Sequence, residues 1–114
     1  MKIKNLEIAL ALFEEAAIKH AEATEQGDYK TGNKNYKDIA RVIDYLTLNN
    51  QLLSLKQFLN NSSVGVRMWS ATYLLALFEN ESLKVLNEIS NMQGIHSLTA
   101  KTTISEWQKG NLKL

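Results

Sequence analysis

Residues 63–75 read SVGVRMWSATYLL, and apolar side chains continue to Phe78. Ser63 can accept hydrogen bonds from the first N–H groups of a helix, so it predicts where a helix begins. From Val64 to Phe78 the apolar positions cover most of the circumference of a helix. A helix of this kind is buried on several sides. We therefore expect residues 64–78 to form a helix at the centre of the domain.

Five other helices are expected around this central one. Cap residues, glycine stops and apolar positions that recur every three or four residues place them. Their expected ranges are residues 6–26, 28–48, 52–59, 81–91 and 97–109. The expected caps are Asn5, Asp28, Asn80 and Ser97, and the expected stops are Gly27, Gly94 and Gly110. The chain contains no proline that would force a break. The sequence thus predicts an all-α fold of about five to six helices.

The apolar stripes also predict which side of each helix is buried. In the first helix the stripe contains Phe13, Ala17 and His20. In the second helix it contains Tyr29, Tyr36 and Ile39, with Gly32 as a place where the first helix can approach closely. In the last helix Leu98, Ile104 and Trp107 are expected to point inward.

Composition excludes several classes of protein. The 114 residues fit one domain, residues 1–114. The 13 basic and 12 acidic residues give a net charge of +1, and no cluster of Lys and Arg is visible. This balance argues against nucleic-acid binding, which requires many phosphate contacts. The absence of cysteine removes disulfides and thiolate metal sites. No apolar run approaches the roughly 20 residues of a membrane span, so we expect a cytoplasmic protein without membrane contact.

The chain is weakly similar to itself after a shift of thirty residues. Asn50 then falls on Asn80, Leu53 on Leu83, and Leu59 on Ile89. A helix pair repeated at a fixed spacing is typical of helical solenoids, although HEAT units have a longer period of roughly 40–47 residues. The period favours a right-handed stack of helix pairs.

Residues 63–75 resemble the HEAT-type pattern, in which a polar cap and Val-Arg are followed by alternating small and large apolar residues. Residues 80–86 look like the partner helix of the same repeat. The whole chain also resembles a small bacterial HEAT-like family of unknown function. That likeness includes residues 13–29, residues 66–69 and the stretch around Glu106-Trp107.

This resemblance implies a HEAT/armadillo-like α–α superhelix. Some relatives of that family are suspected to be immunity proteins in bacterial toxin systems. No catalytic motif is carried over by the resemblance, so it implies neither an active site nor a cofactor.

Three large or charged residues of the helical faces are candidates for structural or binding roles. Arg67 is expected to bond a neighbouring acid, with Asp38 or Asp44 as partner. Trp69 is expected in the core. Trp107 lies near the end of the last helix, where a tryptophan is either core or a binding anchor, and we take it as a candidate partner-binding residue.

The remaining candidates are polar. Glu15 and Glu22 are one heptad apart on the first helix, which makes them a candidate docking patch for a basic partner. Glu15 also has Lys19 four residues later, a spacing that favours an ion pair. His20 is expected to be packed against the core, and His96 to lie in a solvated loop.

These patterns favour a non-enzymatic module that binds another protein, either as an immunity-type inhibitor or in another complex. The sequence contains no nucleophile elbow, phosphate loop or histidine pair at metal spacing. We therefore expect no catalytic residue, cofactor or metal. The alternative is a nucleic-acid-associated helical-repeat protein. A third hypothesis is an enzyme with an unrecognised site, which would require a deep pocket joining His20 to the acidic residues. The partner and the oligomeric state stay open.

Overall fold

The computed structural model describes residues 3–112, and all regular structure within this range is helical. The predicted domain, residues 1–114, includes Met1, Lys2, Lys113 and Leu114, which lie outside the described residues. The elements are α1 (Leu6–Gln26), α2 (Tyr29–Leu48), the 3-10 helix η1 (Leu52–Phe58), α3 (Val64–Leu74), α4 (Glu79–Ser90) and α5 (Ile95–Gln108). The prediction of an all-α fold is confirmed.

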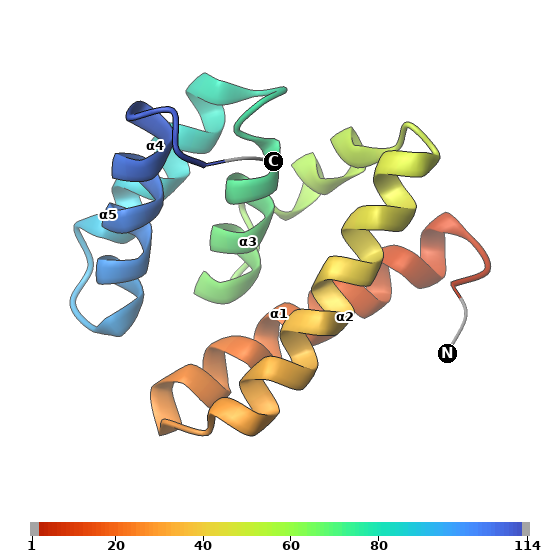
Figure 1. Cartoon of the computed structure of the whole chain (residues 1–114), viewed down its shortest axis with the longest axis horizontal. Helices are drawn as coiled ribbons and strands as arrows, with labels where there is room; N and C mark the ends of the chain where they lie inside the picture. The colour runs from red at the N-terminus through yellow and green to blue at the C-terminus, as the bar shows by residue number, and fades with distance from the viewer. Residues whose placement is uncertain (1–2, 113–114) are drawn as a thin grey trace.

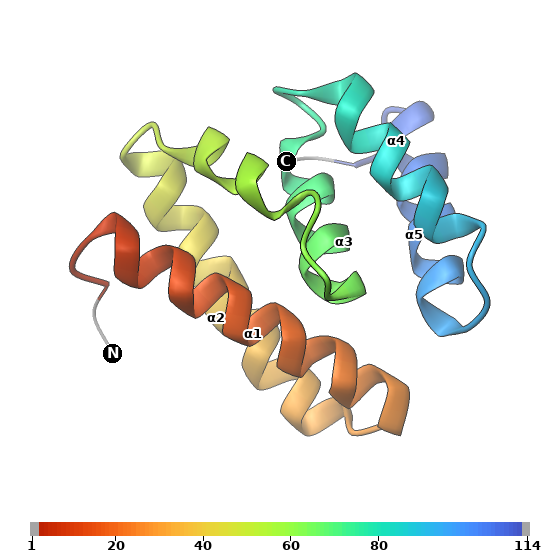
Figure 2. The same ribbon diagram turned by 180° about the vertical axis from the view of Figure 1, so that it is seen from behind.

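The helices form two antiparallel pairs with α3 between them. α1 packs along α2, and α4 packs along α5 (Figure 1). α3 contacts α1 on one side and both α4 and α5 on the other, and η1 covers a further part of it, as the reverse view shows (Figure 2). The central position expected for this helix is confirmed.

The first two helices begin and end where the sequence predicts. The Asn5 side chain accepts a hydrogen bond from the Ile8 N–H (2.8 Å), and Asp28 accepts one from the Thr31 N–H (3.2 Å). Gly27 ends α1 with φ of +72°, a conformation that glycine adopts without strain. The short connection at Gly27-Asp28 turns the chain so that α2 runs back along α1.

Two other boundaries differ from the prediction. α3 ends at Leu74 rather than Phe78, and α4 begins at Glu79 with Phe78, not Asn80, as its cap residue. Phe78 leaves the helical conformation (φ −147°, ψ 55°), and its partly buried ring packs on the core beneath the Lys56 ammonium, 4.2 Å from the ring centroid. The turn thus places the Phe78 ring against the core, whereas a continuous helix would have directed this ring elsewhere.

α5 begins three residues earlier than a helix capped by Ser97 would, because Gly94 is its cap residue. Gly94 adopts φ of +113°, which favours glycine. Ser97 does not cap the helix. Its hydroxyl instead donates to the Gly94 carbonyl (2.8 Å). At the other end, Gly110 has the positive φ (+77°) expected of a stop.

The core runs between the two helix pairs through α3. Its largest fully buried side chains include Phe13, Ile39, Leu46, Leu74, Leu75 and Leu86. α1 and α3 approach very closely at Gly65, where an added Cβ would lie 2.6 Å from the Ala17 carbonyl oxygen. Gly32 does not have the role expected of it, since a Cβ there would meet only the Ala23 methyl at 3.9 Å.

Three expected core residues point outward instead. Tyr29 is 76% exposed, Tyr36 46% exposed and Leu98 64% exposed. The buried face of α2 is rotated relative to the prediction and consists of small, amide and aliphatic residues: Gly32, Asn35, Ile39, Val42 and Leu46. Within residues 3–112, no helix combines the length and the apolar character that crossing a membrane requires.

Candidate functional site

Three aromatic rings meet where α2 faces α3. The Trp69 indole stacks on the Tyr73 ring one turn later, with ring centroids 5.9 Å apart and planes at 19°. The Tyr36 ring lies against the same indole, with centroids 5.7 Å apart and planes tilted by 47°. Trp69 was expected in the core, but it is only partly buried. The partly buried Trp69 indole lies at the base of a surface on which the Tyr36 ring is more exposed to solvent.

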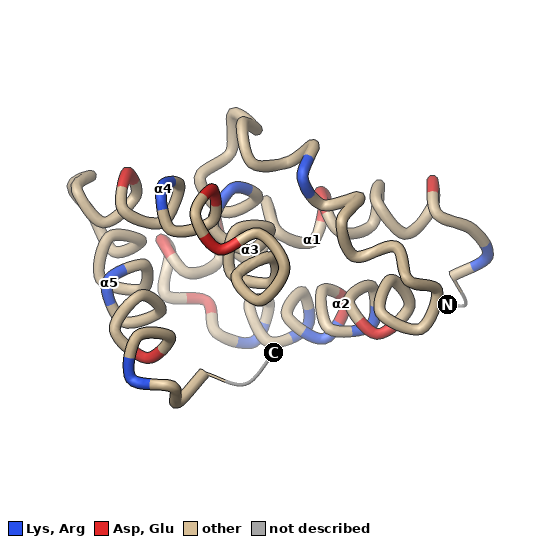
Figure 3. The backbone as a smooth tube through the Cα atoms, turned by 90° about the horizontal axis from the view of Figure 1, so that it is seen from above, with Lys and Arg blue, Asp and Glu red and all other residues tan. Residues whose placement is uncertain are grey.

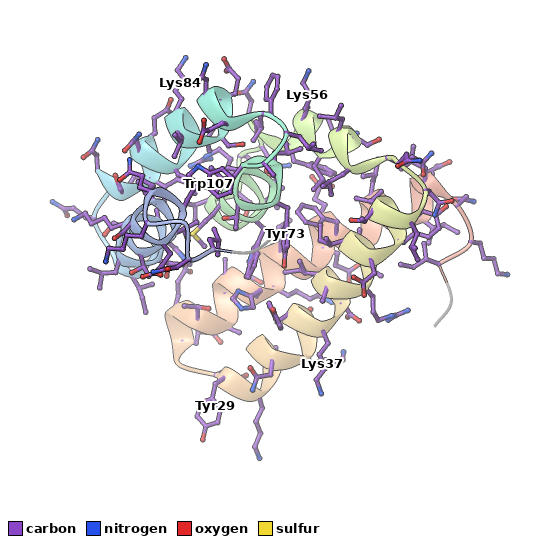
Figure 4. The ribbon with its side chains drawn as sticks, turned by 45° about the horizontal axis from the view of Figure 1, so that its top comes forward. Tyr29, Lys37, Lys56, Tyr73, Lys84 and Trp107 are labelled. Atoms are coloured by element: carbon purple, nitrogen blue, oxygen red, sulfur yellow. The ribbon has the colours of Figure 1, made fainter. Side chains whose placement is uncertain are left out.

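The Tyr73 hydroxyl is held in its neutral form. Burial, together with the nearby Tyr36 and the negative charge of Asp44, raises the pKa of Tyr73 to about 12. Like any protonated tyrosine, the group can donate as well as accept a hydrogen bond at neutral pH, and the raised pKa extends this range to more alkaline solution. In Figure 4 this side chain extends from α3 toward α1 and α2.

Two hollows lie at the ends of this aromatic cluster. One, of about 270 Å³, lies at the turn between α1 and α2 and is lined by His20, Asp28, Tyr29 and Gly32, among others. The other, of about 340 Å³, lies between the end of α2, η1 and the end of α3. Its lining residues are Thr47, Asn50, Leu52, Leu53, Tyr73, Ala76 and Leu77.

The cluster and the hollows form one continuous surface. His20 lines the first hollow and touches Trp69, while Tyr73 stacks on Trp69 and lines the second hollow. We call this surface the aromatic face and define it by Tyr29, Tyr36, Leu53, Trp69, Tyr73 and Leu77. Leu53 and Leu77 are 51% and 56% exposed. Large apolar side chains are thus presented to solvent along most of its length.

Both histidines of the chain lie beside this face. His20 is packed, as expected, with its ring edge-on to the indole of Trp69. Burial, and to a smaller extent the charge of His96, lowers the pKa of His20 from its usual 6.5. The prediction of a solvated His96 is wrong, because its side chain is only 11% exposed. Its Nε2 lies 2.8 Å from the Glu25 carboxylate, which joins the start of α5 to the end of α1.

Arg67 bonds the backbone rather than an acid. Its Nη1 donates to the carbonyls of Asn61 (2.8 Å) and Ser62 (3.3 Å). The expected partners lie elsewhere: Asp38 pairs with Arg41 on α2, and Asp44 lies near Tyr73. The arginine therefore closes the loop before α3, a structural role reached through different partners from those expected.

The same loop is tied to α1. The Asn61 amide donates to the Glu14 carboxylate (2.7 Å), and its side-chain oxygen accepts from the Ser63 N–H (2.9 Å). Asn61 and Arg67 together fix the start of α3, the helix that carries Trp69 and Tyr73.

Of the three residues predicted to bind a partner, Glu15 and Glu22 line one open hollow of about 400 Å³ on α1, as their spacing predicts, and Trp107 lies apart from them. Glu15 and Glu22 are exposed on α1, and Glu15 forms the expected ion pair with Lys19 (2.7 Å). Trp107 packs at the end of α5, where its indole N–H donates to the Glu79 carboxylate of α4 (2.6 Å). None of the three belongs to the aromatic face.

Sequence reasoning missed Tyr29, Tyr36, Leu53 and Leu77 as surface residues. Tyr29 and Tyr36 are one heptad apart and were placed on the buried stripe of α2. A signal was present, because the aliphatic and small residues of α2 form a complete stripe without them. If the aliphatic stripe had been taken as the buried side of α2, Tyr29 and Tyr36 would have been predicted on a second, exposed side.

Within residues 3–112, no three His, Asp or Glu side chains gather so that they could hold a metal ion. His20 and Asp28 share the first hollow, but the Asp28 carboxylate already accepts hydrogen bonds from the backbone and the hydroxyl of Thr31. Two buried polar atoms in this region, the indole nitrogen of Trp69 and Nδ1 of His96, have no hydrogen-bond partner among the described residues.

The chain is similar to one solved structure over almost its entire length. The protein RPA1889 from Rhodopseudomonas palustris CGA009 matches 99% of this chain with 99% of its own, with a TM-score of 0.88 and 18% sequence identity. At this identity the match shows a shared fold. No family model matches the chain, and no curated protein does.

Proposed function

We propose that the chain is a non-enzymatic module that binds another protein through its aromatic face. The observation that carries the proposal is the Tyr36–Trp69–Tyr73 cluster, in which Tyr36 is half exposed and the Trp69 and Tyr73 rings packed beside it are partly buried. Tyrosine and tryptophan provide large contact areas at a small cost in conformational entropy, and they are enriched where binding energy concentrates. The hollows at both ends offer room for side chains of a partner.

The architecture supports this role. We propose that the helix pairs follow a HEAT/armadillo-like superhelix, whose inner surfaces commonly bind other proteins. In this arrangement α2 and α3 would line the inner surface. The resemblance of residues 63–75 to a HEAT unit supports this assignment.

A more specific proposal is an immunity-type inhibitor that blocks a bacterial toxin in the cytoplasm. Its support is the resemblance of the sequence to a bacterial family in which some members are suspected immunity proteins. Toxin and immunity genes are neighbours when they act together, so a toxin gene beside the gene for this chain is the expected result. Its consistent absence from related genomes would contradict the inhibitor role but leave protein binding intact.

The second candidate is a nucleic-acid-associated helical-repeat protein. Four basic residues of α2, Lys30, Lys34, Lys37 and Arg41, follow one side of the helix. The nearly neutral net charge, +1, weighs against this candidate. Binding to duplex DNA that weakens steeply with added salt would revive it.

Co-purification with matched variants tests the leading proposal. The unaltered chain, the face variant Tyr29→Ala/Tyr36→Ala and the control Lys84→Ala/Glu88→Ala would be expressed in the native host and captured. All four positions are exposed, so circular dichroism should show three folded proteins. A protein recovered with the unaltered chain and the control, and at least about tenfold less with the face variant, is expected from the loss of one hot-spot energy. If every protein is recovered in the same amount with the face variant as with the unaltered chain, the proposal is wrong.

A further inference from the structure

Two exposed lysines flank the first half of the aromatic face, about 100° farther round α2 than Tyr29 and Tyr36. Lys30 follows Tyr29 and Lys37 follows Tyr36, and both lysines are exposed. They are seven residues apart, which places them on one side of α2 at about 10 Å along the axis. Neither has an acidic side chain within 4.0 Å among the described residues. Figure 3 shows blue segments recurring along α2, and in Figure 4 Lys37 projects away from the body of the protein.

The two other basic residues of α2 lie nearer to acidic side chains. The pKa of Glu15 on α1 is lowered mainly by its hydrogen bond to Lys19 and to a small extent by the charge of Lys34, and Arg41 pairs with Asp38. Lys30 and Lys37 are therefore the positive charges that the beginning of the face offers to a partner.

The opposite end of the face has a different character. Leu53 and Leu77 border the second hollow, and more than half of each side chain is exposed. The nearby charge is negative, since Asp44 lies close enough to influence Tyr73. The face thus changes along α2 from basic and aromatic to apolar with an acid at its edge.

We propose that the partner presents an amphipathic segment whose acidic half lies against Lys30 and Lys37 and whose large apolar side chains fill the hollow between Leu53 and Leu77. This inference rests on the proposed function. From Lys30 to Thr47 α2 rises about 25 Å, so a helical segment of about 16 residues or an extended one of about eight would cover the face.

A protein segment fits this surface better than a nucleic acid does. A nucleic-acid strand carries negative charge at every nucleotide, so it would bring phosphates against Asp44 as well as the lysines. The exposed leucines offer a favourable contact to aliphatic or aromatic side chains and none to phosphates. A segment with charge at one end and apolar side chains at the other matches both halves.

Selection from a random peptide library tests the inference. A phage library of random 16-residue peptides would be selected on the purified full chain, and the best peptide synthesised with a fluorescent label. We expect enriched peptides to be net acidic, with their apolar residues gathered toward one end. Lys30→Gln/Lys37→Gln should weaken binding of the labelled peptide about fivefold at low salt, the effect of two exposed charge pairs, and less in 0.5 M NaCl.

The control is Lys84→Gln/Lys101→Gln, which removes the same charge from exposed sites on α4 and α5. It should weaken binding less than about twofold. Enrichment of neutral or basic peptides, no enrichment above bare support, or equal weakening by both variants would overturn the inference. So would tighter binding of a 20-nucleotide single-stranded DNA than of the selected peptide. A host protein whose capture requires Tyr29 and Tyr36 but ignores Lys30→Gln/Lys37→Gln would leave the proposed function intact and refute only the inference.

Discussion

The imidazole of His20 meets the indole of Trp69 edge-on, with ring centroids 5.2 Å apart and planes at 86°. This contact joins α1 to α3 directly beneath the aromatic face. It buries much of a titratable ring, which is why the pKa of His20 falls below its usual 6.5. The contact between His20 and Trp69, on which the aromatic face rests, should therefore depend on the protonation of His20 and so on pH.

Stability should decrease in mildly acidic solution because of His20. As pH falls below 6.5 the unfolded chain takes up a proton at this position, whereas the folded chain does so only at its lower pKa. The free energy of unfolding therefore falls with pH across this window and levels off below it. In urea titrations at pH 7.5 and 5.5, His20→Phe, which keeps a packed ring, should lose less stability than the unaltered chain. An equal loss in both proteins would contradict the assignment.

Gly65 should tolerate no side chain. An added methyl group would lie 2.6 Å from both the carbonyl oxygen of Ala17 and the methyl of Ala21, so α1 and α3 would have to separate. We expect Gly65→Ala to lower the free energy of unfolding by about 1–3 kcal/mol, the usual cost of overpacking. Gly32→Ala is the matched control, since its methyl meets only ordinary contact. It should stabilise the protein by about 0.5–1 kcal/mol. Equal effects of the two substitutions in urea titrations would refute the close approach.

Asn61 should matter more than its neighbour Asn60. Its side chain bonds both the Glu14 carboxylate and the Ser63 N–H, whereas Asn60 is exposed. Asn61→Ala removes two hydrogen bonds and should cost about 1–3 kcal/mol, and Asn60→Ala should cost less than about 0.5 kcal/mol. Thermal unfolding of both variants provides the comparison. Identical midpoints would show that the loop does not depend on this residue.

The bond from Trp107 to Glu79 should tie the end of α5 to the start of α4. A double-mutant cycle with Trp107→Phe and Glu79→Ala isolates this bond from the packing of the ring. Because the bond is charge-assisted but exposed, we expect a coupling energy of about 1 kcal/mol. A coupling near zero would assign Trp107 to packing alone.

The helices were predictable because their signals are local. The side chains of Asn5 and Asp28 accept hydrogen bonds from backbone N–H groups three residues later, and Gly27 ends α1 through bonds to the Ala23 and Thr24 carbonyls. Phe78 was misplaced since its position depends on the core and on Lys56, which is 22 residues away. Local propensity favoured a longer helix there, and tertiary packing decided against it.

The candidate site was much less predictable. Tyr29 and Tyr36 match a buried helical stripe as well as an exposed one, because periodicity gives the sides of a helix but not which side meets a neighbour. The hydrogen bond of Arg67 to a carbonyl, and the contact of His96 with Glu25 across 71 residues, depend on how α3 and α5 dock. No local pattern contains that information.

Site-specific photo-crosslinking in the native host tests the binding role of the aromatic face most directly. A photoreactive phenylalanine analogue would replace Tyr29, Leu53 or, as the control, Lys84, all of which are exposed. The structure places Tyr29 and Leu53 at opposite ends of one face and Lys84 on α4. We predict that the first two positions crosslink to the same protein and that position 84 does not. No crosslinked protein at positions 29 and 53, or equal crosslinking at position 84, would contradict the claim that this face binds a protein partner.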